Sequence, residues 1–324
     1  MNYYFAPMEG VTKFVYRNAH HNYFQGVDKY FAPFVVTTQG GKLKNRELQD
    51  LFPENNEGVA LIPQILGNNA QDFINTSKKI KQLGYDEINL NLGCPSGTVV
   101  AKKKGSGLLS DLELLDQFLE EIFAADVTKL SIKTRLGIED PEEFYPIMEL
   151  YNKYEMTELI IHPRVQKDFY KNKPNLSVFG EALSMSKNKI CYNGDLFTPD
   201  ELRAFCEAYP SIDRVMIGRG LIANPAFIEE LRTGQELKKD TLKAFHDELL
   251  ASYRELLSGD RNVLFKMKEV WFYMKHMFED SEKYAKKIRK AERLDDYKAA
   301  VSAMFSEKEI LSGNDCTLDQ IFHK

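Results

Sequence analysis

Eight short runs of apolar, β-branched and aromatic residues recur along the first two thirds of the chain and constrain its fold more than any other feature. Successive runs start 25 to 43 residues apart, which leaves room for a helix between each pair. A strand–helix unit repeated eight times predicts an α/β fold of the (β/α)8 TIM-barrel type, with a doubly wound sheet as the structural alternative. The runs are Tyr3–Met8, Lys29–Val35, Ala60–Leu66, Glu87–Leu92, Leu130–Leu136, Glu158–Pro163, Lys189–Asn193 and Arg214–Gly218.

Two segments between these runs show clear helical periodicity. Gln71–Leu83 and Ser110–Ala124 place apolar residues three and four positions apart, which is typical of an amphipathic helix. Ser110, with Glu113 three residues later, predicts a capped start for the second helix.

Alternation within the runs predicts which side chains reach the barrel mouth. In the fifth run, Leu130 and Ile132 lie on one face, whereas Ser131, Lys133 and Arg135 lie on the other. We expect the apolar face to pack on the helices and the polar face to line the mouth, where barrels of this type keep their active sites.

Strand-like runs stop after about residue 235, and helical periodicity replaces them. The expected helices are Thr241–Leu257, Val263–Phe278, Ser281–Lys290 and Leu294–Phe305. We therefore predict a catalytic barrel over residues 1–235 and a smaller C-terminal all-α domain over residues 236–324. Residues 283–293 hold six Lys or Arg and one Glu, and composition alone favours a solvated helix face for them.

Charge and cysteine content exclude several classes of protein. With 43 basic and 48 acidic residues the formal charge is −5, which excludes a uniformly basic nucleic-acid-binding protein but not a local basic face. The four cysteines contain no C-x-x-C pair, which fits a reducing cytosol and argues against a structural zinc site. No apolar stretch of about 18 residues and no signal-peptide pattern is present, so we expect a cytoplasmic protein without a membrane span.

Small or polar residues follow seven of the eight predicted strands and would meet at one rim. Each has an ordinary structural explanation on its own, such as a paired charge for Lys133 or a buried small side chain for Cys94. Their joint occurrence at equivalent strand ends predicts an active site. They are Pro7, Met8, Glu9, Gln64, Asn91, Cys94, Lys133, His162, Arg164, Asn193, Gly194, Asp195, Gly218 and Arg219.

Two of these groups suit a phosphate. The last strand runs into Gly218-Arg219-Gly220, where glycines let the backbone approach an anion and Arg219 supplies a charged fork. Loops after the seventh and eighth strands are the usual phosphate site of this fold. Residues 193–195 supply the other half, although Asn-Gly-Asp alone is also an ordinary turn. Lys133 is placed to put a cation beside an electron-rich ring.

Cys94 lies in the longest interval between strands, where a functional loop is expected. An unperturbed thiol has a pKa of about 8.5 and can donate a proton at neutral pH without special tuning. A nucleophilic cysteine would need a base, and the nearby residues include Lys102–Lys104 but no histidine. We therefore favour a general acid, while approach of His162 from the sixth strand leaves a thiolate role open.

In this order the motifs resemble those of the tRNA-dihydrouridine synthases, flavin enzymes that reduce uridine in tRNA. That family has a helical tRNA-binding domain where this chain has its C-terminal helices. The combination of N-x-G-C-P, I-K-x-R and N-G-D is the most specific part. The matching motifs are APMEGVT (6–12), PQILG (63–67), NLGCPSG (91–97), KKGSG (103–107), IKTRLG (132–137), HPR (162–164), NGD (193–195) and GRG (218–220).

The resemblance implies a role for each candidate residue. Asn91 and Arg164 would contact the flipped uracil, and Cys94 would be the general acid. NADPH would reduce bound FMN, the flavin would pass a hydride to C6 of uracil, and Cys94 would protonate C5. The implied partners are tRNA and NADPH, with a monomeric protein and no metal. FMN would be held by Pro7, Met8, Glu9, Gln64, Lys133, His162, Asn193, Gly194, Asp195, Gly218 and Arg219.

Two alternatives are compatible with the same residues. An FMN barrel acting on a free pyrimidine, as dihydroorotate dehydrogenases do, would share the phosphate site and the lysine but would not need a helical domain. A catalytically silent RNA-binding barrel would not need Cys94 and Lys133. The negative net charge is only a mild objection to tRNA, because Lys102–Lys104 and Lys283–Arg293 could supply local cations.

Overall fold

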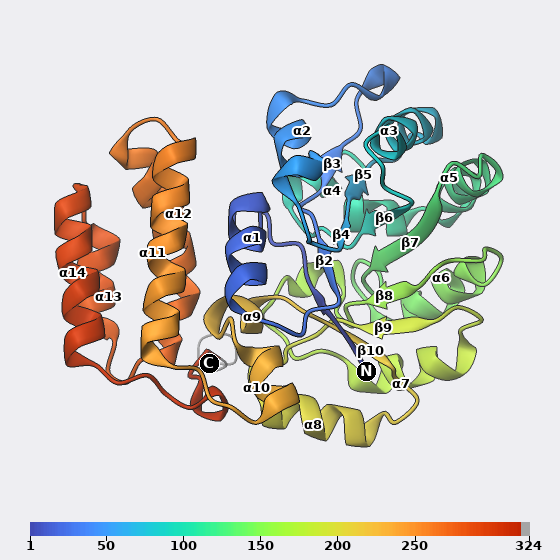
Figure 1. Ribbon diagram of the computed structural model, residues 1–324. Helices are drawn as coiled ribbons and strands as arrows, with labels where there is room; N and C mark the ends of the chain where they lie inside the picture. Colours follow the sequence, from blue (N-terminus) through green and yellow to red (C-terminus); the bar gives the residue numbers. More distant parts are fainter. Residues whose placement is uncertain (319–324) are drawn as a thin grey trace.

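A ring of parallel strands forms the centre of the structure, a computed structural model that describes residues 1–318 (Figure 1). Two of the eight predicted runs are each divided into two short strands, so ten strands occupy the eight strand positions of the barrel. β2 pairs with β4 and β3 with β5, which closes the ring and confirms a TIM barrel over an open doubly wound sheet. The strands are β1 (Asn2–Phe5), β2 (Lys29–Phe31), β3 (Val35–Val36), β4 (Leu61–Ile62), β5 (Gln64–Leu66), β6 (Glu87–Leu92), β7 (Lys129–Thr134), β8 (Leu159–Ile161), β9 (Ile190–Tyr192) and β10 (Arg214–Ile217).

Helices surround this ring on the outside. Both helices expected from periodicity are present, but Asp111, not Ser110, caps the second one, because its side chain accepts a hydrogen bond from the Leu114 amide. The Ser110 hydroxyl instead donates to the Gly107 carbonyl within a preceding 3₁₀ turn. The barrel helices are α1 (Phe14–Tyr23), α2 (Asn45–Leu51), α3 (Ala70–Gln82), α4 (Gly97–Val100), α5 (Leu112–Ala124), α6 (Phe144–Tyr151), α7 (Leu176–Met185), α8 (Pro199–Ala208), α9 (Arg219–Ala223) and α10 (Phe227–Thr233).

The two faces of the strands point to two different cores. Leu130 and Ile132 of β7 belong to the large core between barrel and helices, whereas Ser131 points inward and is fully buried. A second, smaller apolar cluster fills the barrel interior. It consists of Tyr4, Ala6, Phe31, Ile62, Ile160, Cys191 and Met216. As the alternation along the strands predicts, polar side chains such as Ser131 point into the barrel, above this apolar cluster.

A charge network closes the opposite, N-terminal end of the barrel. The fully buried Glu158 carboxylate accepts hydrogen bonds from the Tyr4 hydroxyl (3.0 Å), Arg214 Nη1 (3.1 Å) and Lys29 Nζ (3.3 Å). Lys29 also donates to Glu87 at 2.8 Å. Lys29, Glu87 and Arg214 begin their strands. Glu158 precedes β8, and Tyr4 lies within β1. The network therefore joins five strands near this end of the barrel and leaves the other end for chemistry.

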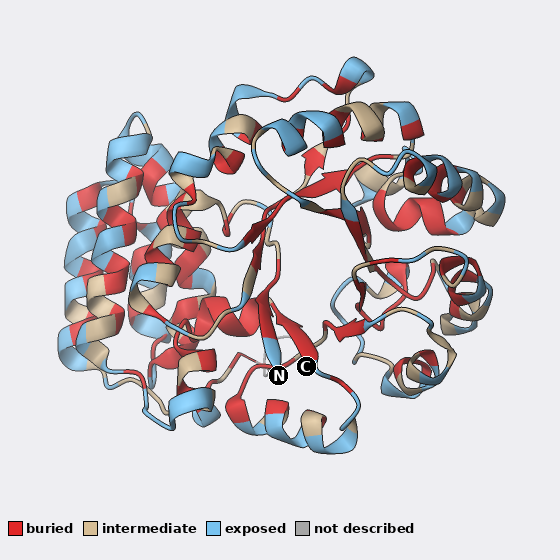
Figure 2. Ribbon diagram, turned by 45° about the vertical axis from the view of Figure 1, so that its right-hand side comes forward, coloured by how far each residue is buried: buried red, intermediate tan, exposed pale blue. Residues whose placement is uncertain are grey.

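Four further helices follow the barrel, as predicted: α11 (Lys239–Leu256), α12 (Asp260–Met274), α13 (Glu282–Lys290) and α14 (Leu294–Glu307). The bundle packs on α1 through Phe245, whose ring lies 5.6 Å from Tyr16 and 5.2 Å from Phe24, centroid to centroid. Figure 2 shows that the exposed residues of these helices lie on their outer surface. The division into two domains at residue 235 stays a prediction.

Within residues 1–318, no helix combines the length and the apolar character needed to span a bilayer. The same residues bring no three His, Cys, Asp or Glu side chains together in a group that could hold a metal ion. All four cysteines are free thiols.

We expect Glu158→Gln to lower the free energy of unfolding by about 3 kcal/mol, because it removes the fully buried charge that Arg214 and Lys29 share and leaves them only the more exposed carboxylates of Asp213 and Glu87. Urea titration followed by the fluorescence of Trp271, the single tryptophan, measures this change. The exposed neighbour Glu155→Gln is the matched control and should change stability by less than about 0.5 kcal/mol. Equal stability of the two variants would contradict a structural role for the network.

Candidate functional site

A line of buried amide side chains leads from the barrel interior to the mouth. Asn89 Nδ2 donates to Ser131 Oγ (2.9 Å), and Gln64 Nε2 donates to Asn89 Oδ1 (2.7 Å). Asn91 Nδ2 then donates to Gln64 Oε1 (2.7 Å). Since each amide both donates and accepts along the line, the orientation of every member is fixed by its neighbours.

Asn91 connects this line of hydrogen bonds to the turn that holds Cys94. Its Oδ1 accepts from the backbone amides of Gly93 (3.0 Å) and Cys94 (2.9 Å). On the other side, Ser106 Oγ donates to the Cys94 carbonyl at 2.8 Å. Gly105 has φ +55°, and a Cβ there would lie only 3.0 Å from the Cys94 Cβ. The KKGSG motif therefore packs directly against the cysteine turn.

The Cys94 side chain is half-buried at the mouth. Burial raises the pKa of its thiol, although the nearby Arg135 and Lys133 charges oppose that shift. The thiol is therefore protonated at neutral pH, which suits a proton donor better than a nucleophile.

Two cations beside Cys94 have no carboxylate partner within residues 1–318. Burial, reinforced by repulsion from Arg135, lowers the pKa of Lys133 to about 7, and its ammonium makes no hydrogen bond or ion pair there. Arg135 donates to three backbone carbonyls, those of Gly93 (3.0 Å), Val165 (2.8 Å) and Phe169 (2.7 Å). This leaves positive potential at the mouth that favours an anionic or electron-rich ligand.

Arg164 and Arg219 converge on one carboxylate at the ends of β9 and β10. Both form ion pairs with Asp195. Arg164 Nη1 also donates to His162 Nε2 at 2.8 Å. Because a guanidinium can only donate, Nε2 must accept, so the imidazole is neutral with its proton on Nδ1. Burial, followed by the surrounding cations, lowers the pKa of His162 well below its ordinary value, in agreement with a neutral ring.

Close backbone packing explains the glycines of these loops. A Cβ at Gly194 would lie 1.9 Å from the Tyr192 hydroxyl, and one at Gly220 would lie 2.4 Å from the Leu196 carbonyl oxygen. Asn193 Nδ2 donates to the Met216 carbonyl at 2.8 Å, which ties the loop after β9 to β10. No larger residue fits the two glycine positions without movement of the loops.

The loop after β1 completes the rim. Pro7 and Met8 are half-buried, Glu9 is exposed, and the Met8 amide donates to Thr12 Oγ1 at 2.8 Å. A Cβ at Gly218 would lie 3.4 Å from Met8 Sδ, so this loop contacts the Gly218-Arg219-Gly220 segment.

The structure thus brings the predicted residues to one end of the barrel, but it shows two groups within them. Gln64 and Asn91 use their amides on each other and on the cysteine turn, and Arg164 is engaged by Asp195 and His162. These three position the site, and contacts of their side chains with cofactor or uracil stay a prediction.

The site contains two participants that are not among the candidate residues from sequence. Alternation along the strand predicts that Arg135 faces the mouth with Lys133, but it gives Arg135 no role, whereas Tyr170 was missed altogether. The Tyr170 ring lies 4.9 Å from the Arg219 guanidinium and 5.4 Å from that of Arg135. Nothing in the local sequence predicts this position, because it depends on the path of the loop after β8.

Comparison with known proteins identifies the family. The family model described as "Dihydrouridine synthase (Dus)" matches residues 4–321. A probable tRNA-dihydrouridine synthase of Staphylococcus aureus strain Mu50 is 30% identical over 252 residues, which cover 72% of this chain and 73% of the relative. A tRNA-dihydrouridine(16) synthase of Ralstonia nicotianae is 27% identical and covers 70% of this chain and 71% of its own length.

Solved structures agree on the fold alone. A 2-naphthoyl-CoA reductase has a TM-score of 0.56 at 14% identity and covers 72% of this chain, which spans 50% of that protein. Morphinone reductase has a TM-score of 0.50 at 13% identity, covering 73% of this chain and 88% of its own. The barrel and the motif order lead to the same result as the family match: this chain belongs to the dihydrouridine synthase family of oxidoreductases.

Proposed function

We propose that this chain reduces a uridine of tRNA, with FMN as its bound cofactor and NADPH as the reductant. The observation that supports this most is the pairing at the barrel mouth of a protonated thiol, Cys94, with a half-buried ammonium, Lys133, that has no anionic partner within residues 1–318. The family match supports the substrate class and the use of a flavin.

The residues at the mouth fit FMN. The Lys133 ammonium needs an anionic or electron-rich group to compensate it, as the polar edge of a flavin would. The neutral His162 offers an Nδ1 proton as a hydrogen-bond donor. Arg219, with the tightly packed loops at Gly194 and Gly218, would hold the ribityl chain and phosphate. Pro7, Met8 and Glu9 would cover the ring from the loop after β1.

The chain's own contribution to the reaction is a proton at a fixed position. Reduced FMN, when bound, supplies the hydride to C6 of uracil. The Cys94 thiol gives its proton to C5, and the neighbouring Lys133 and Arg135 charges stabilise the thiolate until solvent reprotonates it. The uridine must leave its stack to reach this turn, which costs a few kcal/mol that contacts elsewhere on the tRNA have to offset.

A basic groove between α13 and α14 supports tRNA binding. It has a volume of about 970 Å³, and lysines of α13 face the small Ala299 and Ala303 of α14 across it. Four lysines line it against two acidic residues, Glu292 and Asp296, so its net charge is positive. Lys286, Lys287 and Lys290 are exposed and form no ion pair with any residue from 1 to 318. Phosphates would therefore meet cations that need not break an existing contact.

The charge of Lys133 should couple FMN binding to pH. Above pH 7 the free ammonium loses its proton, so binding must take one up, and FMN affinity should fall by up to about tenfold per pH unit between pH 7 and 9. Quenching of FMN fluorescence by the apoprotein measures this. Lys133→Met should bind FMN more weakly at pH 7 and lose the slope, whereas Lys129→Met, exposed at the far end of β7, should keep it. An unchanged slope in Lys133→Met would exclude this role.

Cys94→Ala should reduce the rate of uridine reduction about 10²–10⁴-fold, because the proton donor at C5 is lost. Dihydrouridine formed in a tRNA transcript, measured by mass spectrometry, reports this, and reduction of the flavin by NADPH should stay nearly normal. Cys206→Ala is the matched control, since that thiol is also half-buried but lies on α8. Wild-type turnover by Cys94→Ala would make Cys94 structural.

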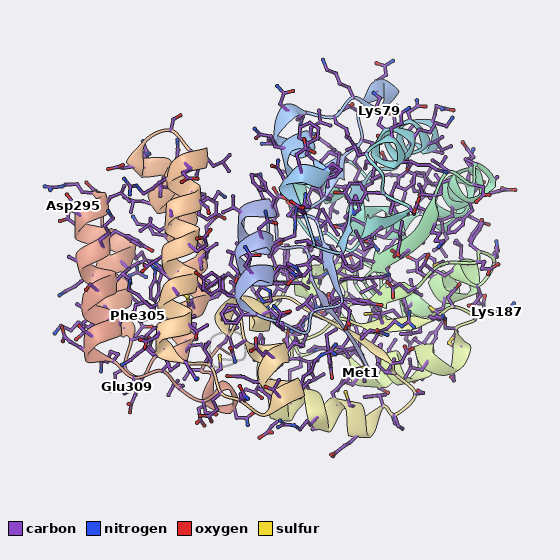
Figure 3. All side chains as sticks on the ribbon, in the orientation of Figure 1. Met1, Lys79, Lys187, Asp295, Phe305 and Glu309 are labelled. Carbon is purple, nitrogen blue, oxygen red and sulfur yellow. The ribbon has the colours of Figure 1, made fainter. Side chains whose placement is uncertain are left out.

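Replacing Lys286, Lys287, Arg289 and Lys290 together by Gln should weaken tRNA binding and flatten its salt dependence. Each lost phosphate contact should remove about 0.7–0.9 from the slope of log affinity against log salt. Gln at Lys78, Lys79 and Lys81 of α3 is the control, because Lys79 lies across the barrel from Asp295 and Phe305, which mark the two ends of α14 (Figure 3).

The salt titration separates two outcomes. An unchanged slope in the quadruple variant would leave α13 as a solvated helix and place the RNA site elsewhere. A wild-type protein that turns over a free pyrimidine and has no affinity for tRNA would overturn the proposed substrate.

A further inference from the structure

Two phenylalanines on α12 are the most exposed large apolar side chains of residues 1–318. Phe265 is 59% exposed and Phe272 is 49% exposed. They lie seven positions apart and so share one face of the helix, about 10 Å apart along its axis. Exposed aromatic rings on one face are a common feature of a binding surface.

Contacts place Phe265 beside the barrel mouth, and Phe272 lies two helical turns farther along the same face of α12. The Phe265 ring lies 5.3 Å from Lys266 Nζ, which donates to the Gly10 carbonyl (2.8 Å) just after the rim residue Glu9. The Phe272 ring lies 5.0 Å from the Tyr273 ring, edge to face.

Basic side chains surround the second ring. A groove between α12 and α13 includes Phe272 together with Lys268, Lys275, Lys286 and Arg289. Lys275 pairs with Glu282, whereas Lys286 and Arg289 point to solvent. Aromatic rings set among cations match a single-stranded nucleic acid, in which phosphates and unstacked bases alternate.

We propose that Phe265 and Phe272 are stacking platforms for unpaired tRNA bases next to the uridine that enters the barrel mouth. This inference rests on the proposed function and adds positioning residues to it. Every base has a π-face, so phenylalanine can hold bases without reading their sequence, and the stacking would offset the cost of extracting the uridine.

Stacking predicts a dependence on the ring rather than on apolar character. With an unmodified tRNA transcript at fixed salt, Phe265→Ala, Phe272→Ala and the matching Leu variants should each raise the Kd about 5- to 100-fold. Phe272→Tyr and Phe265→Tyr should keep it within about twofold. Leu256→Ala is the control, since Leu256 is also an exposed apolar side chain, 41% exposed, but lies at the end of α11 and not on the face that Phe265 and Phe272 share. Flavin content and melting temperature confirm that each variant folds.

A second measurement needs no turnover. Phe272→Trp adds an exposed indole to a chain whose only tryptophan, Trp271, is buried, and its fluorescence should be quenched when the tRNA transcript is added. Leu256→Trp should not respond.

The outcomes are distinguishable. If wild-type protein does not bind the transcript, the proposed function fails. If wild type binds it but the Ala variants bind equally well, the stacking inference is overturned while the function stands. If Leu variants bind like wild type and only Ala variants weaken, the face is an apolar docking surface, as for a protein partner, and stacking is again overturned.

Discussion

The amide line from Ser131 to the Cys94 turn is the constraint on which the barrel mouth depends. It crosses three adjacent strands, β5, β6 and β7, and ends on two backbone amides. A buried amide that loses a partner costs more free energy than the hydrogen bond contributes when it is present, so the line acts as a unit. The position of the Cys94 turn is therefore fixed by the interior of the barrel, although Cys94 lies in a long connection between strands.

Charge distribution complements this rigidity. Asp195 pairs with both Arg164 and Arg219, which leaves one net positive charge there, while Lys133 and Arg135 lie next to the thiol without a carboxylate partner within residues 1–318. The end of the site at Asp195 is therefore fixed by ion pairs within the protein. At the end near Cys94, the described residues do not compensate the two cations. This asymmetry favours a ligand whose electron-rich ring lies at Lys133, whereas burial, against the opposing charges of Arg135 and Lys133, keeps the thiol protonated.

Much of this architecture is predictable from sequence, since it follows from periodicity. The eight runs, the four C-terminal helices and the parity of Ser131 and Lys133 are local patterns, and the structure confirms them. The N-cap of α5 is Asp111 and not Ser110, because two neighbouring residues can both cap a helix and tertiary contacts decide between them. Tyr170 and the face formed by Phe265 and Phe272 depend on how distant segments meet, which no local pattern contains. The commitment of Gln64 and Asn91 to each other likewise required the register of β5 against β6.

The contact of Phe245 with Tyr16 and Phe24 has a further consequence. It joins the bundle to α1, which follows directly after the rim loop of residues 7–12, and Lys266 of α12 donates to the Gly10 carbonyl of that loop at 2.8 Å. The rim loop is therefore held by the barrel on one side and by the bundle on the other. A change in the aromatic contact would move the rim residues Pro7, Met8 and Glu9 together with the bundle, so the geometry of the barrel mouth depends on helices that lie outside the barrel.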